Sequence, residues 1–309
     1  MEINNFIYID HNIIQYDYDS IIRLNSTDDY CFVYSDEHFN EFNRKEDDRF
    51  FDVLRRIKAR KIKIKLDSKF QITNEATVLN YVDPRMLYDQ YLTTIEDSKK
   101  YTELFKRIQP YCMGNKDAII PEQVKERFIS QQNDLLASIE VLPNDIIAKY
   151  GELIEIIGEN LNLALQEAKS TILPIEKMRK KISSVNLSEL KKGQVKIIDQ
   201  IWDIVKDKFP GISKDQLFGK EKLIATYPSN DCLFLKIVQC HSILNTLGYY
   251  PDKGLTLVNK VNGINSDASH IAHSIFCSAL LSADDHLCKK AIAIFEYYEI
   301  NTSVLQLLI

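Results

Sequence analysis

Short β-rich runs lie near the two ends of this 309-residue chain, whereas helical patterns dominate its middle. The runs "NFIYI" and "DYCFVYS" near the start are rich in aromatic and β-branched side chains, and "SALLS" near the end is typical of a short buried strand. In the middle, Ile, Leu and Ala recur at spacings of three and four residues, as in amphipathic helices. Because the ends of a domain usually lie close together, we predict one α/β domain built from residues 1–83 and 229–309, interrupted by a mainly α-helical insertion over residues 84–228.

Composition excludes several classes of protein. The chain is 45% hydrophobic with a net charge of −5, which favours a globular domain over a basic protein that coats nucleic acid. None of the six cysteines has C-x-x-C spacing, so a zinc ribbon is not expected. The chain shows no signal peptide and no apolar stretch of the roughly 18 residues that would span a bilayer. We therefore expect a cytoplasmic protein with free thiols and no membrane association.

Acidic residues follow the strands at both ends of the chain. Asp10 comes directly after the first run, and Asp284 follows "SALLS". Glu41 lies on the helix expected after the second strand, and Asp267 is placed in the first turn of a helix that Ser266 caps. Because ligands of open α/β sheets bind beyond the carboxyl ends of the strands, we expect these four carboxylates to meet at one edge of the sheet.

Four converging carboxylates indicate a metal site. Like charges at close range raise one another's pKa unless a cation neutralises them. Mg²⁺ or Mn²⁺ prefers oxygen ligands, activates a bound water and stabilises charge on a phosphoryl oxygen, which is chemistry for cutting a phosphodiester. The alternative is that these acids are ordinary helix caps and solvated side chains, since the chain holds 44 acidic residues.

The ordered set of motifs resembles the PIN-domain ribonucleases, which include toxins of toxin–antitoxin pairs and RNA-processing enzymes. The resemblance covers about residues 1–83 and 229–309. In chain order, the motifs are "IYIDHN" with Asp10 and Asn12, "VYSDEHFNEF" with Ser35 and Glu41 and with Glu37 as its rival, "SDASHIAHSIF" with Asp267, and "LLSADDHL" with Ser282 and Asp284 and with Asp285 competing.

The resemblance implies a three-layer α/β/α fold with a parallel central sheet and a metal-dependent endoribonuclease. It implies that Asp10, Glu41, Asp267 and Asp284 bind Mg²⁺ or Mn²⁺, with hydrogen-bond support from Asn12 and Ser282. The protein would act as a toxin or antiviral-defence effector, and the helical insertion would select the RNA substrate or bind a protein partner. Two alternatives stay open: a PIN-like scaffold without catalysis, and a nuclease of single-stranded or flap DNA.

The strongest basic run is "RRIKARKIKIK", which predicts either an RNA-binding surface or a solvated helix end followed by a charged edge strand. The basic residues with which it would bind RNA phosphates are Arg55, Arg56, Lys58, Arg60 and Lys61.

Several histidines adjoin these acids. His270 and His273 lie three residues apart on the helix of Asp267, a spacing that suits a transition-metal ion. Their apolar neighbours favour packed histidines instead. His11 and His286 adjoin the proposed acids and are placed to contact a phosphate, although a metal-activated water requires neither of them.

Overall fold

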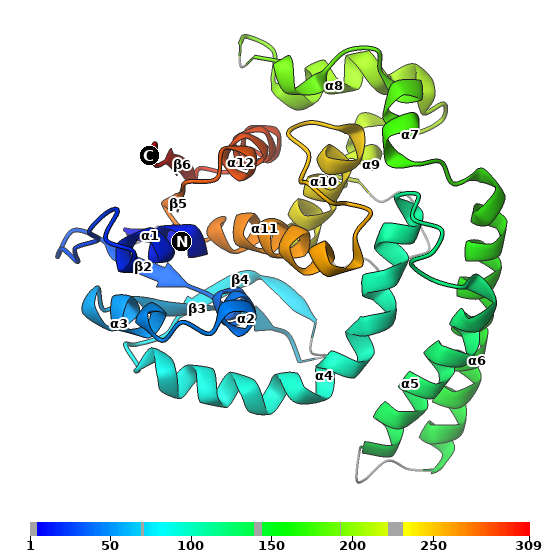
Figure 1. Ribbon diagram of the computed structural model, residues 1–309, viewed down its shortest axis with the longest axis horizontal. Helices are drawn as coiled ribbons and strands as arrows, with labels where there is room; N and C mark the ends of the chain where they lie inside the picture. The colour runs from blue at the N-terminus through cyan, green and yellow to red at the C-terminus, as the bar shows by residue number, and fades with distance from the viewer. Residues whose placement is uncertain (1–4, 69–70, 139–143, 192, 222–230) are drawn as a thin grey trace. The chain divides into compact units, whose positions relative to one another are not determined.

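The computed structural model describes residues 5–68, 71–138, 144–191, 193–221 and 231–309 of the chain. Within these residues it is an α/β protein with one six-stranded, mostly parallel sheet (Figure 1). The strands are β1 (Phe6–Ile9), β2 (Cys31–Tyr34), β3 (Arg60–Leu66), β4 (Ile72–Val78), β5 (Ala279–Ser282) and β6 (Ser303–Gln306).

Helices connect the strands and also form the middle of the chain. None of those described is both long and apolar enough to span a bilayer. The α-helices are α1 (His11–Tyr18), α2 (Asp36–Lys45), α3 (Arg49–Arg56), α4 (Pro84–Cys112), α5 (Val124–Ser138), α6 (Asn144–Thr171), α7 (Ile175–Ile182), α8 (Ile197–Val205), α9 (Lys214–Leu217), α10 (Leu233–Leu247), α11 (Val261–Ser274) and α12 (Asp285–Tyr298). Short 3₁₀ turns are η1 (Pro121–Gln123), η2 (Leu187–Glu189), η3 (Lys206–Lys208) and η4 (Val258–Lys260).

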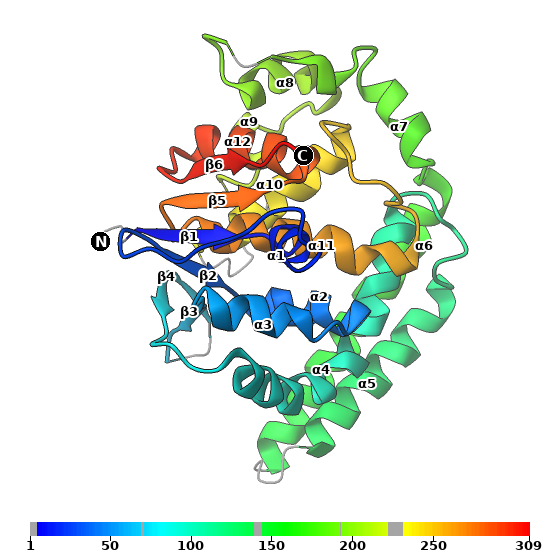
Figure 2. The same cartoon turned by 60° about the vertical axis from the view of Figure 1, so that its left-hand side comes forward.

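The strand order of the sheet is β4-β3-β2-β1-β5-β6, and only the β3–β4 pair is antiparallel. Figure 2 shows the strands from β6 at the top to β3 and β4 at the bottom. The chain winds from β1 through β2 to β3 in one direction and then returns to the other side of β1 with β5 and β6. The order therefore reverses between β1 and β5, where a crevice opens beyond the carboxyl ends of the two strands.

Both faces of the sheet are apolar at its central strands. Tyr8, Val33 and Leu280 are buried in one core with Leu244 of α10 and Ile294 of α12. Because successive side chains of a strand point to opposite faces, the neighbouring residues face the other side, where α1 packs against α3. Figure 2 shows α1 and α3 in front of the sheet and α12 behind it. Both faces are covered, which explains why these strands are apolar along their whole length.

The segment "KIKIKL" forms the strand predicted for it, but not at an edge of the sheet. Its alternation of charged and apolar side chains predicts an edge strand or a half-exposed strand. The second alternative holds, because β3 is half-exposed and lies between β2 and β4. Residues 72–78 form β4, which pairs antiparallel with β3. The sheet is therefore mixed rather than wholly parallel, because β4 follows β3 through a short connection that only an antiparallel strand permits.

Contacts divide the chain into two compact units. The first comprises Met1–Tyr91, Arg179–Asp252 and Gly263–Ile309 and contains the sheet. The second comprises Leu92–Met178 and Lys253–Asn262 and has a core of its own around Leu104, Val124 and Ile154. The helical middle region is thus present, and part of the segment expected to be an insertion, residues 179–221, belongs to the unit that contains the sheet. The expected boundary at residue 229 lies outside the described residues.

Candidate metal centre

Asp10 occupies the position directly after β1, where it caps α1. Its backbone N–H continues the sheet by donating to the Leu281 carbonyl at 2.9 Å. Its Oδ1 accepts from the His11 N–H at 2.7 Å, and its Oδ2 accepts from Asn12 Nδ2 and Ser282 Oγ, each at 2.6 Å. Asp10 is therefore held in one orientation by residues of α1 and β5, on the two sides of the switch point.

Glu41 reaches the same place from the middle of α2. Its Oε1 accepts from Ser266 Oγ at 2.7 Å and from Arg44 Nη2 at 3.0 Å. Its Oε2 lies 3.3 Å from His270 Nε2 and 3.5 Å from His11 Nδ1. Both Glu41 Oε2 and His11 Nδ1 are buried without a hydrogen bond of good geometry to any described residue. Such unsatisfied buried atoms are costly, and in native proteins they commonly mark a binding site.

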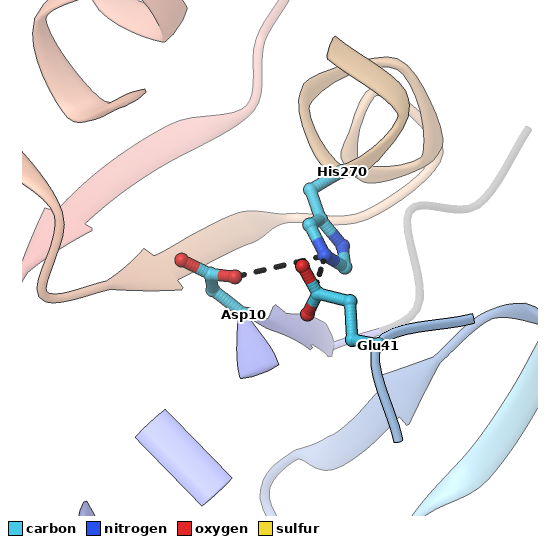
Figure 3. Close-up of side chains that lie close together, drawn as sticks. All are labelled: Asp10, Glu41 and His270. Atoms are coloured by element: carbon cyan, nitrogen blue, oxygen red, sulfur yellow. Dashed lines mark ion pairs between the residues drawn. The ribbon is translucent and has the colours of Figure 1, made fainter. Parts of the chain in front are cut away.

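His270 completes the cluster from α11 and is fully buried. Its Nδ1 forms a hydrogen bond of 2.8 Å with the Tyr8 hydroxyl, and Tyr8 in turn contacts Ser35 Oγ at 2.7 Å. This arrangement leaves His270 Nε2 facing the two acids, 3.7 Å from Asp10 Oδ1. Figure 3 shows the three side chains pointing toward one another from β1, α2 and α11. One ligand atom from each lies within 4.8 Å of the others.

The charges of the cluster shift the three pKa values in different directions. Burial raises the pKa of Asp10, and the charge of His270 offsets this only in part. Burial would also raise the pKa of Glu41, but the charge of His270 outweighs burial, so the pKa of Glu41 is lowered. Burial would lower the pKa of His270, whereas the charge of Glu41 outweighs it and raises the value to about 9. In the absence of a metal, a positive charge on His270 therefore compensates the two carboxylates.

Asp267 and Asp284 line the same cavity of about 280 Å³ as Asp10 and Glu41. Burial raises the pKa of Asp267 well above its usual value, and the charge of Asp252 adds to this effect. Asp284 is exposed and caps α12, with its Oδ1 accepting from the Leu287 N–H at 2.8 Å. The four acids named from the sequence thus surround one cavity, and only Asp10 and Glu41 belong to the tight cluster with His270.

The helix of Asp267 differs from the one expected. We predicted a helix that begins after Ser266 with Asp267 in its first turn, but α11 begins at Val261. Asp267 is therefore an interior residue and not a cap. Val261 and Ile264 are buried, at 1% and 5% exposed, and their helical spacing extends the helix through a stretch whose Asn and Gly residues favour turns.

The supporting residues fall into two groups. Asn12 and Ser282 lie in the site: Asn12 Oδ1 accepts from the Ala283 N–H at 3.2 Å, and Ser282 Oγ accepts from the Asp284 N–H at 3.0 Å. Ser35 caps α2 and supports Tyr8 without lining the cavity. Two rival acids also lie outside the cavity lining. Glu37 accepts a hydrogen bond from Asn40, and Asp285 accepts one from Gln306.

The basic run is dispersed over α3, the following turn and β3, and none of its residues lines the cavity. Arg55 pairs with Asp83 at 2.8 Å, Arg56 with Asp17, and the buried Lys61 with Asp36. Lys58 and Arg60 are exposed. Three of the five proposed RNA-binding cations therefore already have a partner acid, and RNA binding by this run stays a prediction.

The site also contains residues that the sequence analysis did not assign to it. His270 was interpreted as a packed histidine, although it lies three residues after Asp267 and so on the same face of the helix. Arg44 follows Glu41 by three residues, and Lys45 is exposed beside it on the rim. The i, i+3 spacing was the available signal for His270 and Arg44. His273 is packed as expected, with its Nδ1 2.8 Å from the Ser269 carbonyl.

Comparisons with models of protein families, with curated proteins and with solved structures each found no match to this chain.

Proposed function

We propose that the protein is a divalent-metal-dependent endonuclease with a PIN-like domain and that it cuts the phosphodiester bonds of RNA. One observation carries the proposal. Asp10, Glu41, Asp267 and Asp284 come from segments far apart in the sequence and line one cavity. That cavity lies beyond the carboxyl ends of β1 and β5, where open α/β sheets bind their ligands.

The donor set suits a hard or borderline cation. Asp10, Glu41, Asp267 and Asp284 would supply oxygen ligands to Mg²⁺ or Mn²⁺, and the unsatisfied Glu41 Oε2 is an acceptor that a cation would satisfy. When bound, such an ion lowers the pKa of a coordinated water and stabilises negative charge on a phosphoryl oxygen. Asn12 and Ser282 would keep the Asp10 carboxylate in place by the hydrogen bonds described above.

The rim of the cavity supports a phosphate-containing substrate. Arg44 and Lys45 line it from α2 and are exposed. A cation at the edge of an acidic site attracts a phosphate backbone and lowers the repulsion between that backbone and the acids. The choice of RNA over DNA comes from the resemblance of the motifs to PIN-domain ribonucleases.

The proposal includes a three-layer arrangement of helices, sheet and helices. A three-layer α/β/α domain is supported by helices on both faces of the sheet and by five mutually parallel strands.

The helical middle would be an insertion that binds a protein partner. A stripe of exposed apolar residues on α6 supports this role, because exposed apolar patches commonly mark protein–protein contacts. Its members are Ile147, Tyr150, Leu153, Ile156, Ile157 and Leu163, each 41–58% exposed.

The test is cleavage of end-labelled RNA and of single-stranded and flap DNA with matched sequence, each with Mg²⁺, with Mn²⁺ and with a chelator. The purified protein should cut RNA only when metal is present. Asp10→Asn and Asp284→Asn should each lower the rate at least ~100-fold, since each removes a carboxylate from the cavity. Circular dichroism should show that both variants remain folded.

Asp285→Asn is the matched control, because Asp285 adjoins Asp284 in the sequence but does not line the cavity. It should cut RNA at the rate of the unchanged protein. Full activity of both site variants would refute the assignment of the site. Cleavage of DNA alone would indicate a DNA nuclease, and absence of both cleavage and Mn²⁺ binding would indicate a scaffold without catalysis.

A further inference from the structure

We infer that the ion of this site is a first-row transition-metal ion bound by a mixed set of ligands: His270 Nε2, Asp10 Oδ1 and Glu41 Oε2. This inference deepens the proposed function by adding a histidine nitrogen to the oxygen ligands and by narrowing the class of ion. It rests on that proposal only for the catalytic use of the site.

The positions of the three ligand atoms carry the inference. His270 Nε2 lies 3.3 Å from Glu41 Oε2 and 3.7 Å from Asp10 Oδ1. Two atoms that each lie about 2.2 Å from one ion are at most about 4.4 Å apart, and one ligand atom from each of the three residues lies within 4.8 Å of the other two. Small rotations of the two carboxylates are enough to bring the set into coordinating distance.

A second observation, two buried atoms without a hydrogen bond, points to a missing ligand. His11 is 8% exposed, and its Nδ1 is directed toward Glu41 Oε2 at 3.5 Å without a hydrogen bond to any described residue. Glu41 Oε2 is likewise unsatisfied, whereas Oε1 of the same carboxylate accepts from Ser266 and Arg44. A cation at Oε2 would satisfy that acceptor, which among the described residues otherwise has only the contacts with His270 at 3.3 Å and with His11 at 3.5 Å.

Tyr8 is the positioning residue of this set. Its hydroxyl contacts His270 Nδ1 at 2.8 Å and Ser35 Oγ at 2.7 Å, and Tyr8 is fully buried. Histidines that ligate metals are oriented in this way by a partner on the other ring nitrogen. The Tyr8 contact directs Nε2 toward the acids and makes it the ring nitrogen available to an ion.

The nitrogen ligand determines the class of ion. Mg²⁺ prefers oxygen ligands throughout and retains its waters, whereas imidazole nitrogen favours the first-row transition metals. The site therefore selects Mn²⁺ and its heavier neighbours over Mg²⁺.

The test uses the full chain after chelator treatment, with Mn²⁺ as the probe and Mg²⁺ as the competitor. Calorimetry should show that Mn²⁺ binds at least ~10-fold more tightly than Mg²⁺. Electron spin-echo spectroscopy of the Mn²⁺ complex should show coupling to a ring nitrogen, and labelling of histidine with ¹⁵N should change that signal. The labelling experiment requires no substitution and so remains informative even if a variant fails to fold.

Variants then identify which histidine is bound. His270→Gln should abolish the nitrogen coupling, while His273→Gln, one turn away on the same helix, and His11→Gln should retain it. Tyr8→Phe should keep the coupling and weaken Mn²⁺ binding by ~10–100-fold.

Three results would overturn the inference: no Mn²⁺ binding, Mn²⁺ binding without nitrogen coupling, or equal affinity for Mg²⁺. The outcome is separate from that of the nuclease proposal. If the protein binds Mn²⁺ through His270 but leaves RNA intact, the proposed nuclease function is refuted and the proposed ligand set is supported. If the protein cuts RNA with Mg²⁺ bound only by oxygen ligands, the nuclease function is supported and the ligand set with His270 is refuted.

Discussion

A second buried polar cluster supports the site from the side of α12. Lys290 is fully buried and donates to Asp252 and, at 3.1 Å, to Asn245 Oδ1. Asn245 Nδ2 donates to the other oxygen of Asp252 at 2.7 Å. The charge of Asp252 raises the pKa of Asp267, and that of Lys290 lowers it. The ion pair of Asp252 and Lys290 therefore influences how readily the cavity acid Asp267 ionises.

Lys290→Met should destabilise the protein by about 3–5 kcal/mol, because it leaves the carboxylate of Asp252, whose side chain is 11% exposed, without its counter-ion. Urea unfolding followed by circular dichroism measures the change. Lys289→Met is the matched control, since Lys289 is the neighbouring residue, is 41% exposed at its side chain and lies 4.0 Å from Asp285. It should change stability by less than about 1 kcal/mol. Equal effects of the two substitutions would contradict the role assigned to the buried pair.

At the scale of single elements, helix ends could be read from the sequence wherever one residue type is required. Gly248 follows a helical pattern in the sequence, where glycine is a typical stop signal, and it ends α10 with φ of 98° and its N–H donating to the Leu244 carbonyl at 3.0 Å. Arg179 covers the same end, with Nη2 donating to the Asn245 carbonyl at 2.6 Å. The start of α11 could not be read in this way, because burial of Val261 and Ile264 overrides the turn preference of the sequence there.

Gly248→Ala should cost about 1–2 kcal/mol, because an L-residue is strained at this positive φ. The added Cβ would also lie 3.2 Å from Arg179 Cδ. Gly151→Ala should have the opposite sign, stabilising the protein by about 0.5–1 kcal/mol, since Gly151 is inside α6 and an added Cβ there meets nothing within 4 Å. Urea unfolding of both variants tests the contrast, and a stabilising Gly248→Ala would show that the end of α10 does not need glycine.

At the scale of the whole molecule, buried histidines couple stability to pH. Burial lowers the pKa of His11 and of His273 to about 4, and it lowers the pKa of His38 and His241 well below the usual value. The unfolded chain binds protons at these residues near pH 6.5, whereas the folded chain does not. These four histidines therefore leave the free energy of unfolding unchanged above pH 6.5 and reduce it as the pH falls below 6.5.

His241→Gln should weaken this pH dependence. The side chain of His241 is 1% exposed, and burial together with the charge of Lys290 disfavours its charged form. Its removal should reduce the slope of stability against pH, between pH 6.5 and 4, by up to about 1.4 kcal/mol per unit. Chemical unfolding at a series of pH values gives the slope of each protein. An unchanged slope would mean that His241 takes up its proton without unfolding.

The local patterns of the sequence determined the short strands β1, β2 and β5, the acids that follow β1 and β5, and the glycine that ends α10, because each depends on the preferences of a few adjacent residues. Tertiary structure alone decided that β3 is an interior strand, that His270 faces Asp10 and Glu41, and that Arg44 and Lys45 reach the same cavity. These features depend on which segments lie side by side. That choice is made by the packing of segments that are distant in the sequence, such as α2 and α11. The i, i+3 spacing places His270 beside Asp267 and Arg44 beside Glu41, but it does not say which segments meet.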